Sequence, residues 1–237
     1  MRNYFTLDGT DSRTFGIYIS GQGVFDSPAR EVSFIQVPGR NGDLIGLSTR
    51  LQNGTLTYNE SFIFENFKEN LAAFRAYALM KPGYRRLVDT YNPDEYRLVT
   101  YAGPLAVTPT NVNRAGKFKL VFTCMPQRFL LSGDRPIELT ASASIMNPTM
   151  FDSQPMLRIY GNGVLGVGST NITIASHSYA YMDIDCATGR AYYTANPLDN
   201  KVTLNTIDYP VLHPGSNGIS LGTGITKVII TPRWWTV

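Results

Sequence analysis

Short stretches of strand composition, separated by turn-forming residues, follow one another along almost the whole 237-residue chain. In the first half they are Arg13–Ser20, Glu31–Val37, Thr55–Phe64, Arg86–Thr90, Glu95–Tyr101 and Lys117–Met125. In the second half they are Met156–Tyr160, Thr170–Ala175, Tyr179–Asp185, Arg190–Thr194, Lys201–Leu204 and Gly224–Ile230. This regular spacing, without a repeat of fixed length, is typical of antiparallel β domains and not of solenoids or propellers. The sequence therefore predicts a mainly β protein.

One amphipathic helix interrupts the strand pattern. Its apolar residues recur at helical spacing: Phe67, Leu71, Phe74 and Ala78, with Leu79 widening the stripe. Asn66, followed by Glu69, predicts a capped start, and Pro82-Gly83 predicts a firm end. We expect the apolar stripe to pack against a sheet.

The pattern relaxes around Pro126–Pro136, which predicts a junction between two domains. We expect an N-terminal β-rich domain, residues 1–130, that carries the single helix. Residues 131–237 show no helical pattern, and their alternation of strands and turns predicts an antiparallel β-sandwich. Each half is long enough to bury a core of its own.

Composition excludes several classes of function. Hydrophobic residues make up 43% of the chain and charged residues 16%, and the formal net charge of +3 is too small to indicate a nucleic-acid-binding surface. Cys124 and Cys186 lie in different halves, so we expect no disulfide and no zinc site. Strict alternation in Lys117–Met125 places Cys124 on the core face as a small apolar residue. Without a signal peptide or a bilayer-spanning run, we expect synthesis in a cytoplasm and no membrane insertion.

Asp183 and Asp185 are the strongest candidates for a pair of catalytic carboxylates. Alternation puts both on one strand face with Tyr179 and Tyr181, whose rings could stack on a sugar. A glycoside hydrolase, however, needs a carboxyl with a raised pKa and a substrate cleft. This face is predicted to be solvated, so we favour a plain surface. Contact of these four residues with sugar, or of the carboxylates with calcium, stays an alternative.

No other residues form a recognisable catalytic, metal-binding or cofactor-binding arrangement. His177 and His213 lack partners at a suitable spacing, and His213 is expected in a turn with its ring bonded to backbone. Two glycine-rich segments, Gly161-Asn162-Gly163 and Gly166-Val167-Gly168, lack the lysine and the following helix of a phosphate loop, so we predict turns there.

The adjacent tryptophans near the end of the chain cannot both enter one core. If Lys227–Trp235 is a regular strand, Trp234 shares a face with the apolar residues Val228 and Ile230, and Trp235 lies on the face of Arg233, unless Pro232 introduces a bulge that exchanges the two roles. We therefore expect Trp234 in the sandwich interior. Trp235 is expected to stack with Arg233 and to belong to an interface or a sugar platform.

Six stretches distributed over both halves resemble the distal tail proteins of long-tailed bacteriophages. They are the segments 37–44 (VPGRNGDL), 122–128 (FTCMPQR), 155–163 (PMLRIYGNG), 182–185 (MDID), 210–217 (PVLHPGSN) and 232–235 (PRWW). None of them is a catalytic signature. They occur in the order found in that family, so the resemblance covers nearly the whole chain.

The resemblance implies a structural protein of the virion. It implies that residues 1–130 form a hexameric ring around a channel and that residues 131–237 form a galectin-like sandwich. The implied partners are other copies of the chain, the tail tube protein, the tail-tip protein and receptor-binding proteins, with DNA passing through the channel without specific binding. Arg40, Asn41 and Gly42 form a predicted tight turn. Arg40 is either an exposed loop residue or a donor to a carboxylate of the neighbouring subunit. The predicted interface residues are the three residues of this turn together with Arg233 and Trp235.

Two other classes of function remain as alternatives. The first is a stand-alone carbohydrate-binding module that uses Tyr179, Tyr181 or Trp235 as a stacking surface. The second is a glycoside hydrolase that depends on Asp183 and Asp185, for which no turnover is expected.

Overall fold

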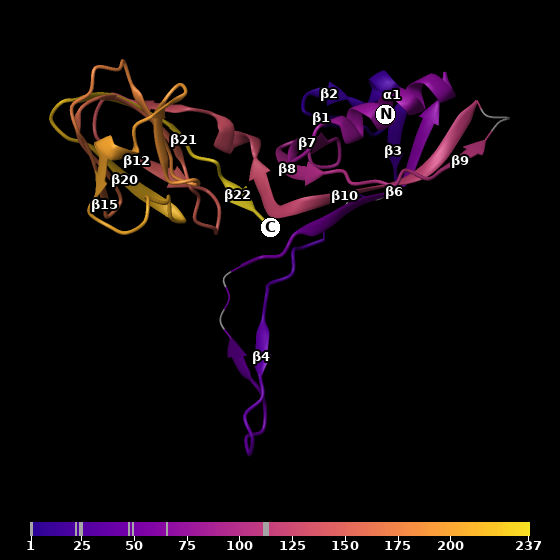
Figure 1. Ribbon diagram of the computed structural model, residues 1–237, viewed down its shortest axis with the longest axis horizontal. Helices are drawn as coiled ribbons and strands as arrows, with labels where there is room; N and C mark the ends of the chain where they lie inside the picture. The colour runs from indigo at the N-terminus through magenta and orange to yellow at the C-terminus, as the bar shows by residue number, and fades with distance from the viewer. Residues whose placement is uncertain are drawn as a thin grey trace. The chain divides into compact units, whose positions relative to one another are not determined.

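The computed structural model describes residues 2–21, 23, 26–46, 48, 50–64, 66–110 and 114–237. It divides into two compact units, Met1–Arg128 together with Val237, and Phe129–Thr236 (Figure 1). Each unit has its own hydrophobic core. The described residues form antiparallel sheets and a single α-helix, so the predicted mainly β class is confirmed.

The first unit is built on one large antiparallel sheet. Its strands are β1 (Phe5–Leu7), β2 (Thr10–Asp11), β3 (Ile17–Ser20), β6 (Gly54–Phe64), β7 (Arg85–Asp89), β8 (Glu95–Thr100), β9 (Val107–Thr110) and β10 (Ala115–Leu130). The order is β2-β1-β7-β8-β10-β6-β3, and β9 pairs with β10. A short 3-10 helix, η1 (Ser12–Phe15), precedes β3 where the sequence predicts the beginning of a strand. The alternation predicted in β10 is confirmed, because Phe118, Leu120, Phe122 and Cys124 are all buried.

The helix α1 (Phe67–Met80) packs its predicted apolar face into this core. Leu71, Phe74 and Ala78 are buried, whereas Leu79 is 56% exposed, so the predicted widening of the stripe is wrong. Leu79 lies about 100° around the helix from Ala78, beyond the stripe that the sheet covers. The predicted cap is wrong too. Asn66 has a left-handed backbone (φ 35°) and its side chain makes no capping hydrogen bond, whereas a capping side chain requires an extended backbone.

A β-bulge in β6 reverses the faces of that strand. Ser61 pairs with Phe118 and Tyr58 pairs with Leu120, so three steps along β6 match two steps along β10. Before the bulge, Leu56 and Tyr58 enter the core; after it, Ser61 and Ile63 do. The side chains of Phe62 and Phe64 consequently lie on the opposite face of the sheet.

Two further strands form a separate hairpin between β3 and β6. β4 (Ser33–Ile35) pairs with β5 (Leu44–Gly46), and these strands make a two-stranded sheet of their own (Figure 1). The pairing continues toward the base of the hairpin through an isolated bridge between Arg30 and Leu51. We call residues 26–53 the arm. The strand predicted at Glu31–Val37 is thus present, but it is shorter.

The second unit is an antiparallel β-sandwich. One sheet has the order β11 (Ile137–Leu139), β21 (Ile225–Thr231), β13 (Met156–Gly161), β16 (Met182–Asp185), β17 (Arg190–Tyr193), β18 (Asn196–Pro197). The other has the order β12 (Ala143–Asn147), β20 (Gly215–Leu221), β14 (Gly163–Val167), β15 (Thr170–Ile174), β19 (Val202–Leu204). Residues of both sheets, among them Leu157 and Ile184 from the first and Leu165 and Ile219 from the second, meet in one core. The remaining short elements are η2 (Leu131–Asp134), η3 (Asp199–Lys201) and β22 (Trp235–Thr236).

Two local predictions for this part of the chain are wrong. Regular strand structure does not end at the start of Pro126–Pro136, because β10 continues to Leu130. The Leu130 amide donates to the carbonyl of Trp234 (2.8 Å). That partner is more than a hundred residues away, so the local pattern contains no sign of it. Gly166 belongs to β14 and not to a turn: a Cβ atom there would lie 2.2 Å from Ser220 Oγ, so a larger residue would require the serine side chain to move.

Two buried serines of the first unit allow a matched test of this packing. The Ser12 hydroxyl donates to Ile17 O (2.9 Å) and accepts from the Phe5 amide (3.3 Å), whereas among the described residues Ser61 Oγ has no partner. We expect Ser12→Ala to destabilise the first unit by about 1–2 kcal/mol, since it leaves the Phe5 amide unpaired. Ser61→Ala should be neutral or stabilise by up to about 1 kcal/mol, since it removes an unpaired buried polar group. Calorimetric unfolding of both variants measures the difference, and equal destabilisation by the two changes would contradict it.

Candidate functional site

The two predicted carboxylates are each held by an arginine. Asp183 is buried and accepts two hydrogen bonds from Arg158, Nε to Oδ1 (2.7 Å) and Nη2 to Oδ2 (2.9 Å). Asp185 accepts from Arg233, Nη1 to Oδ1 (2.6 Å) and Nη2 to Oδ2 (3.4 Å). The prediction of a solvated face is therefore wrong for Asp183. Register explains it: Arg158 lies directly opposite Asp183 on the neighbouring strand, so the guanidinium covers the carboxylate.

This arrangement does not suit general acid catalysis by Asp185. Burial acts to raise the pKa of Asp185, but the hydrogen bond and charge of Arg233, together with the Ala187 amide, outweigh it and hold the pKa below its ordinary value of 3.8. The same kind of bond to Asp183 raises the pKa of Arg158. A carboxyl that serves as an acid near neutral pH needs a raised pKa. The residues therefore act as ion pairs on the outer side of β16.

The tyrosines proposed as sugar platforms are packed against other side chains. Tyr179 and Tyr181 precede β16, which begins only at Met182, so the predicted strand is three residues too long. The ring of Tyr179 stacks on Tyr193 with centroids 4.8 Å apart, and the guanidinium of Arg158 lies 4.2 Å from the centroid of Tyr181. Part of the stacking area that a sugar would use is thus occupied by the protein itself.

As predicted, Trp234 is buried and Trp235 is partly exposed, but the backbone that places them differs from the predicted regular strand. Trp234 is buried at 4% exposure in the core of the second unit, and Trp235 is partly exposed. The segment is not a regular strand: β21 ends at Thr231 and Arg233 has a left-handed backbone (φ 60°). Trp235 stacks on Phe151 (centroids 4.4 Å apart), and its indole Nε1 donates to Asp152 O (2.8 Å). The predicted stacking of Trp235 on Arg233 is therefore wrong, because Arg233 turns toward Asp185.

The histidines and cysteines give no sign of a reactive site. The ring of His213 bonds through Nδ1 to Asp152 Oδ1 (2.8 Å), a carboxylate and not the backbone partner that was expected. Both cysteines are buried, and burial raises the pKa of Cys124 and raises that of Cys186 to about 12. Within the described part of the chain, no three metal-ligating side chains gather. No helix among the described residues has the length and apolar character needed to cross a membrane.

The predicted interface turn forms the tip of the arm. Arg40, Asn41 and Gly42 are all exposed, and the Arg40 amide donates to Val37 O (3.2 Å) to close the turn. Gly39 and Gly42 have φ values of 79° and 83°, a conformation that favours glycine. The Pro-Gly-Arg-Asn-Gly sequence thus lets the chain reverse at this point.

Below the tip, the arm carries apolar side chains on both faces. Phe34 and Ile45 are cross-strand partners at 66% and 62% exposure, and the next pair, Ile35 and Leu44, is also exposed on the other face. Val32 and Val37 extend the two faces and are exposed as well. A two-stranded hairpin is at best marginally stable in water on its own. An exposed apolar surface of this kind marks an interaction site.

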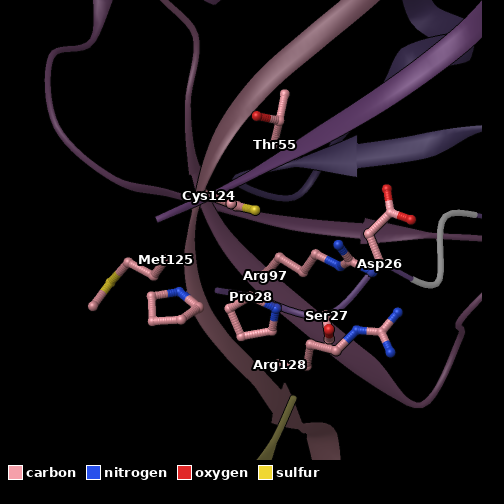
Figure 2. Close-up of a pocket in the computed structure, with 10 residues that line it drawn as sticks. Asp26, Ser27, Pro28, Thr55, Arg97, Cys124, Met125 and Arg128 are labelled. Carbon is pink, nitrogen blue, oxygen red and sulfur yellow. The ribbon is translucent and has the colours of Figure 1, made fainter. Parts of the chain in front are cut away.

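A small pocket lies where the arm leaves and rejoins the large sheet (Figure 2). Its lining comes from Asp26–Pro28 at the start of the arm, from Gly54–Thr55 directly after its end, and from Arg97, Cys124–Pro126 and Arg128. The volume is about 40 Å³, which is room for ordered water and not for an organic ligand. Burial, and then the charge of Arg97, lowers the pKa of Arg128, whose Nε lies 3.2 Å from the carboxylate of Glu95. We interpret the residues around this pocket as the attachment of the arm to the sheet, and not as a binding site.

The ion pair between Arg233 and Asp185 predicts a pH dependence. Because the folded pKa of Asp185 is below 3.8, the ionised carboxylate stabilises the protein above that pH, and the stabilisation is lost as pH falls through the folded pKa. At pH 7 we expect Asp185→Asn to lower the free energy of unfolding by about 1–2 kcal/mol. The difference from the unsubstituted protein should shrink below pH 4 in calorimetric scans. Asp208→Asn, at an exposed position of the same unit, is the control; an undiminished difference at low pH would contradict the ion-pair origin.

The tryptophans allow a direct test of the C-terminal geometry. With Trp235→Phe, the remaining Trp234 should emit at short wavelength and resist acrylamide quenching, because its indole is buried. With Trp234→Phe, the remaining Trp235 should emit at longer wavelength and be quenched more strongly. Adding Phe151→Ala to the second variant should increase the quenching further, since Phe151 covers one face of the indole. The reverse order of quenching would show that the two rings are assigned the wrong way round.

Comparison with known proteins identifies this fold in solved structures. Neither a family model nor a curated protein sequence matches the chain. The Dit protein of phage SPP1, described as a paradigm of the hub adsorption apparatus in phages that infect Gram-positive bacteria, superposes with a TM-score of 0.74 over 100% of both chains at 12% identity. Chains of the phage P2 baseplate in its activated conformation also match. The structure with Ca gives a TM-score of 0.54 over 97% of this chain and 98% of that chain at 14% identity. The structure with Sr gives a TM-score of 0.53 over 96% of this chain and 97% of that chain at 12% identity. The chain therefore has the Dit-like fold of phage hub proteins, as the resemblance of its sequence motifs predicts.

Proposed function

We propose that this chain is the distal tail protein of a long-tailed phage, a hexameric ring that connects the tail tube to the tail-tip apparatus. The observation that carries the proposal is the agreement in fold with the SPP1 Dit protein over the full length of both chains. Agreement over both units is more informative than a match to one β-sandwich, which many unrelated proteins share. The six sequence motifs in family order support the same function independently.

Such a ring acts through geometry and not through bond chemistry. Cyclic assembly needs a heterologous contact, in which one patch of each subunit meets a different patch of the next and the rotation closes. A stable contact buries at least about 1,200 Å² in total. In this proposal residues 1–130 form the ring and residues 131–237 form the galectin-like domain. The exposed apolar faces of the arm supply surface that assembly would bury.

The remaining partners follow from the position of the ring. One rim meets the tail tube protein, the other meets the tail-tip protein, and receptor-binding proteins attach to the assembly. DNA passes through the channel without specific binding, and the net charge of +3 suits that passage, since a dense lysine lining would hold phosphates. The protein is made in the host cytoplasm and resides at the distal end of the virion tail.

Native mass measurement together with particle imaging at micromolar concentration tests the ring. We expect a species of six times 26.3 kDa with a central channel. Antibody labelling of purified virions should mark the distal end of the tail. Virions that lack the protein at this position would overturn the proposal.

The same preparation tests the two alternatives. A monomer that binds sugars on a glycan array would favour the carbohydrate-binding module. Turnover of a glycoside that disappears in Asp183→Asn or Asp185→Asn would favour a hydrolase. We expect neither result, because arginines occupy both carboxylates and tyrosines stack on one another.

A further inference from the structure

The first unit carries a second unusual surface besides the arm, on the outer face of β3 and β6. Tyr18 and Phe62 are cross-strand partners there, and Phe62 stacks on Phe64 with centroids 6.1 Å apart. With Arg2, Asn3, Ile19 and Ser20 they line an open groove of about 310 Å³. We call this the aromatic groove.

The groove exists because of the bulge in β6. Strict alternation from Leu56 and Tyr58 would direct Glu60, Phe62 and Phe64 into the core. The extra residue shifts the period, so Ser61 and Ile63 are buried and the two phenylalanines line the outer face. The rings of Tyr18, Phe62 and Phe64 are half-buried and lie on the same face. Three neighbouring aromatic rings are an unusually large apolar surface for a sheet face that is directed at water.

The rim of the groove is cationic. The guanidinium of Arg2 lies 5.4 Å from the ring centroid of Tyr18 and 5.1 Å from that of Phe64. Lys117 Nζ lies 5.6 Å from the centroid of Phe62 and 2.6 Å from Glu60 Oε1. On the arm, the acidic residue Asp43 is exposed two residues before Ile45. Arg2 beside the groove and Asp43 on the arm thus carry opposite charges.

We propose that the arm of one copy seats Phe34 and Ile45 in the aromatic groove of the next copy. The inference rests on the proposed ring and names the two patches that would form its subunit contact. Phe34 and Ile45 face the same side of the hairpin and are among the most exposed large apolar side chains described. Together they present an aromatic and a branched side chain to a groove lined by three aromatic rings.

A second copy of this chain is the occupant that best fits the pair of surfaces. Donor and acceptor patches occur once each on every subunit and differ from one another, as a cyclic heterologous contact requires. In a closed ring the face of every arm that carries Phe34 and Ile45 finds a groove. The Arg2–Asp43 pair would fix the register of the contact, since charges at the edge of an interface favour the correct alignment.

Disulfide trapping between two differently labelled proteins tests the contact directly. One carries Ile45→Cys and the other Tyr18→Cys, and the two native cysteines are buried. After mixing and mild oxidation, we expect a disulfide-linked dimer between the two labels. A protein carrying both substitutions should give a ladder that ends at six subunits. Ile207→Cys paired with Tyr18→Cys is the control, because Ile207 is 98% exposed but lies in the second unit, outside both patches; it should not cross-link.

A binding measurement complements the trapping. Phe34→Ser should weaken self-association by at least about tenfold in analytical ultracentrifugation, as expected for loss of a central aromatic contact. Ile207→Ser should leave it unchanged, and both variants should keep the thermal unfolding of the parent, since both positions are exposed.

The outcomes separate this inference from the proposed function. A closed hexamer without cross-linking, and without an effect of Phe34→Ser, overturns the arm-in-groove contact and leaves the ring intact. A cross-linked ladder of open chains supports the contact and contradicts the closed ring. A protein that stays monomeric and forms no cross-links contradicts both the arm-in-groove contact and the closed ring.

Discussion

The extra residue in β6 determines which side chains are buried in the part of that strand after Tyr58. Without it, the charged Glu60 would enter a core that already holds Tyr58, Phe74 and Phe122. Burying an unpaired carboxylate costs far more than burying a hydroxyl such as that of Ser61. The bulge avoids that cost, and the same shift moves Phe62 and Phe64 to the outer face. One local irregularity thus sets both the composition of the core and the character of the opposite surface.

The structure also shows where sequence reasoning succeeds and where it fails. Two predictions that depend on periodicity alone are confirmed: the burial of Leu71, Phe74 and Ala78 in α1, and the alternation of β10. Each follows from a repeat that neighbouring residues define. Predictions that depend on a partner distant in sequence fail. Arg158 covers Asp183 because the β13–β16 register places them opposite each other, and no local pattern encodes that register.

The C-terminal segment is a second example of a structure set by contacts that the local sequence pattern does not contain. Gly133 approaches the backbone of Trp234 so closely that a Cβ atom would lie 2.3 Å from its amide nitrogen. The Arg233 amide donates to Gly133 O (2.8 Å), and Arg233 itself adopts a left-handed backbone. These contacts break the regular strand that alternation assumes, yet Trp234 still reaches the core, because the burial of a large aromatic ring outweighs the cost of one unusual backbone angle. The direction of Arg233 and the stacking of Trp235 on Phe151 follow from this break.

Both units leave large apolar side chains exposed, among them Ile207 and Met150 in the second unit and the cross-strand pair Phe34 and Ile45 in the first. In the second unit the outward carboxylates of β16 are paired, the tyrosines stack on one another, and Trp235 rests on Phe151. In the first unit the apolar side chains of the arm are exposed, and the rings of the aromatic groove are half-buried. A hairpin with apolar residues on both faces gains from a neighbour that covers one face, and gains most when neighbours cover both. The exposed cross-strand pairs of the arm are therefore a physical reason to expect that the first unit takes part in a contact with another copy.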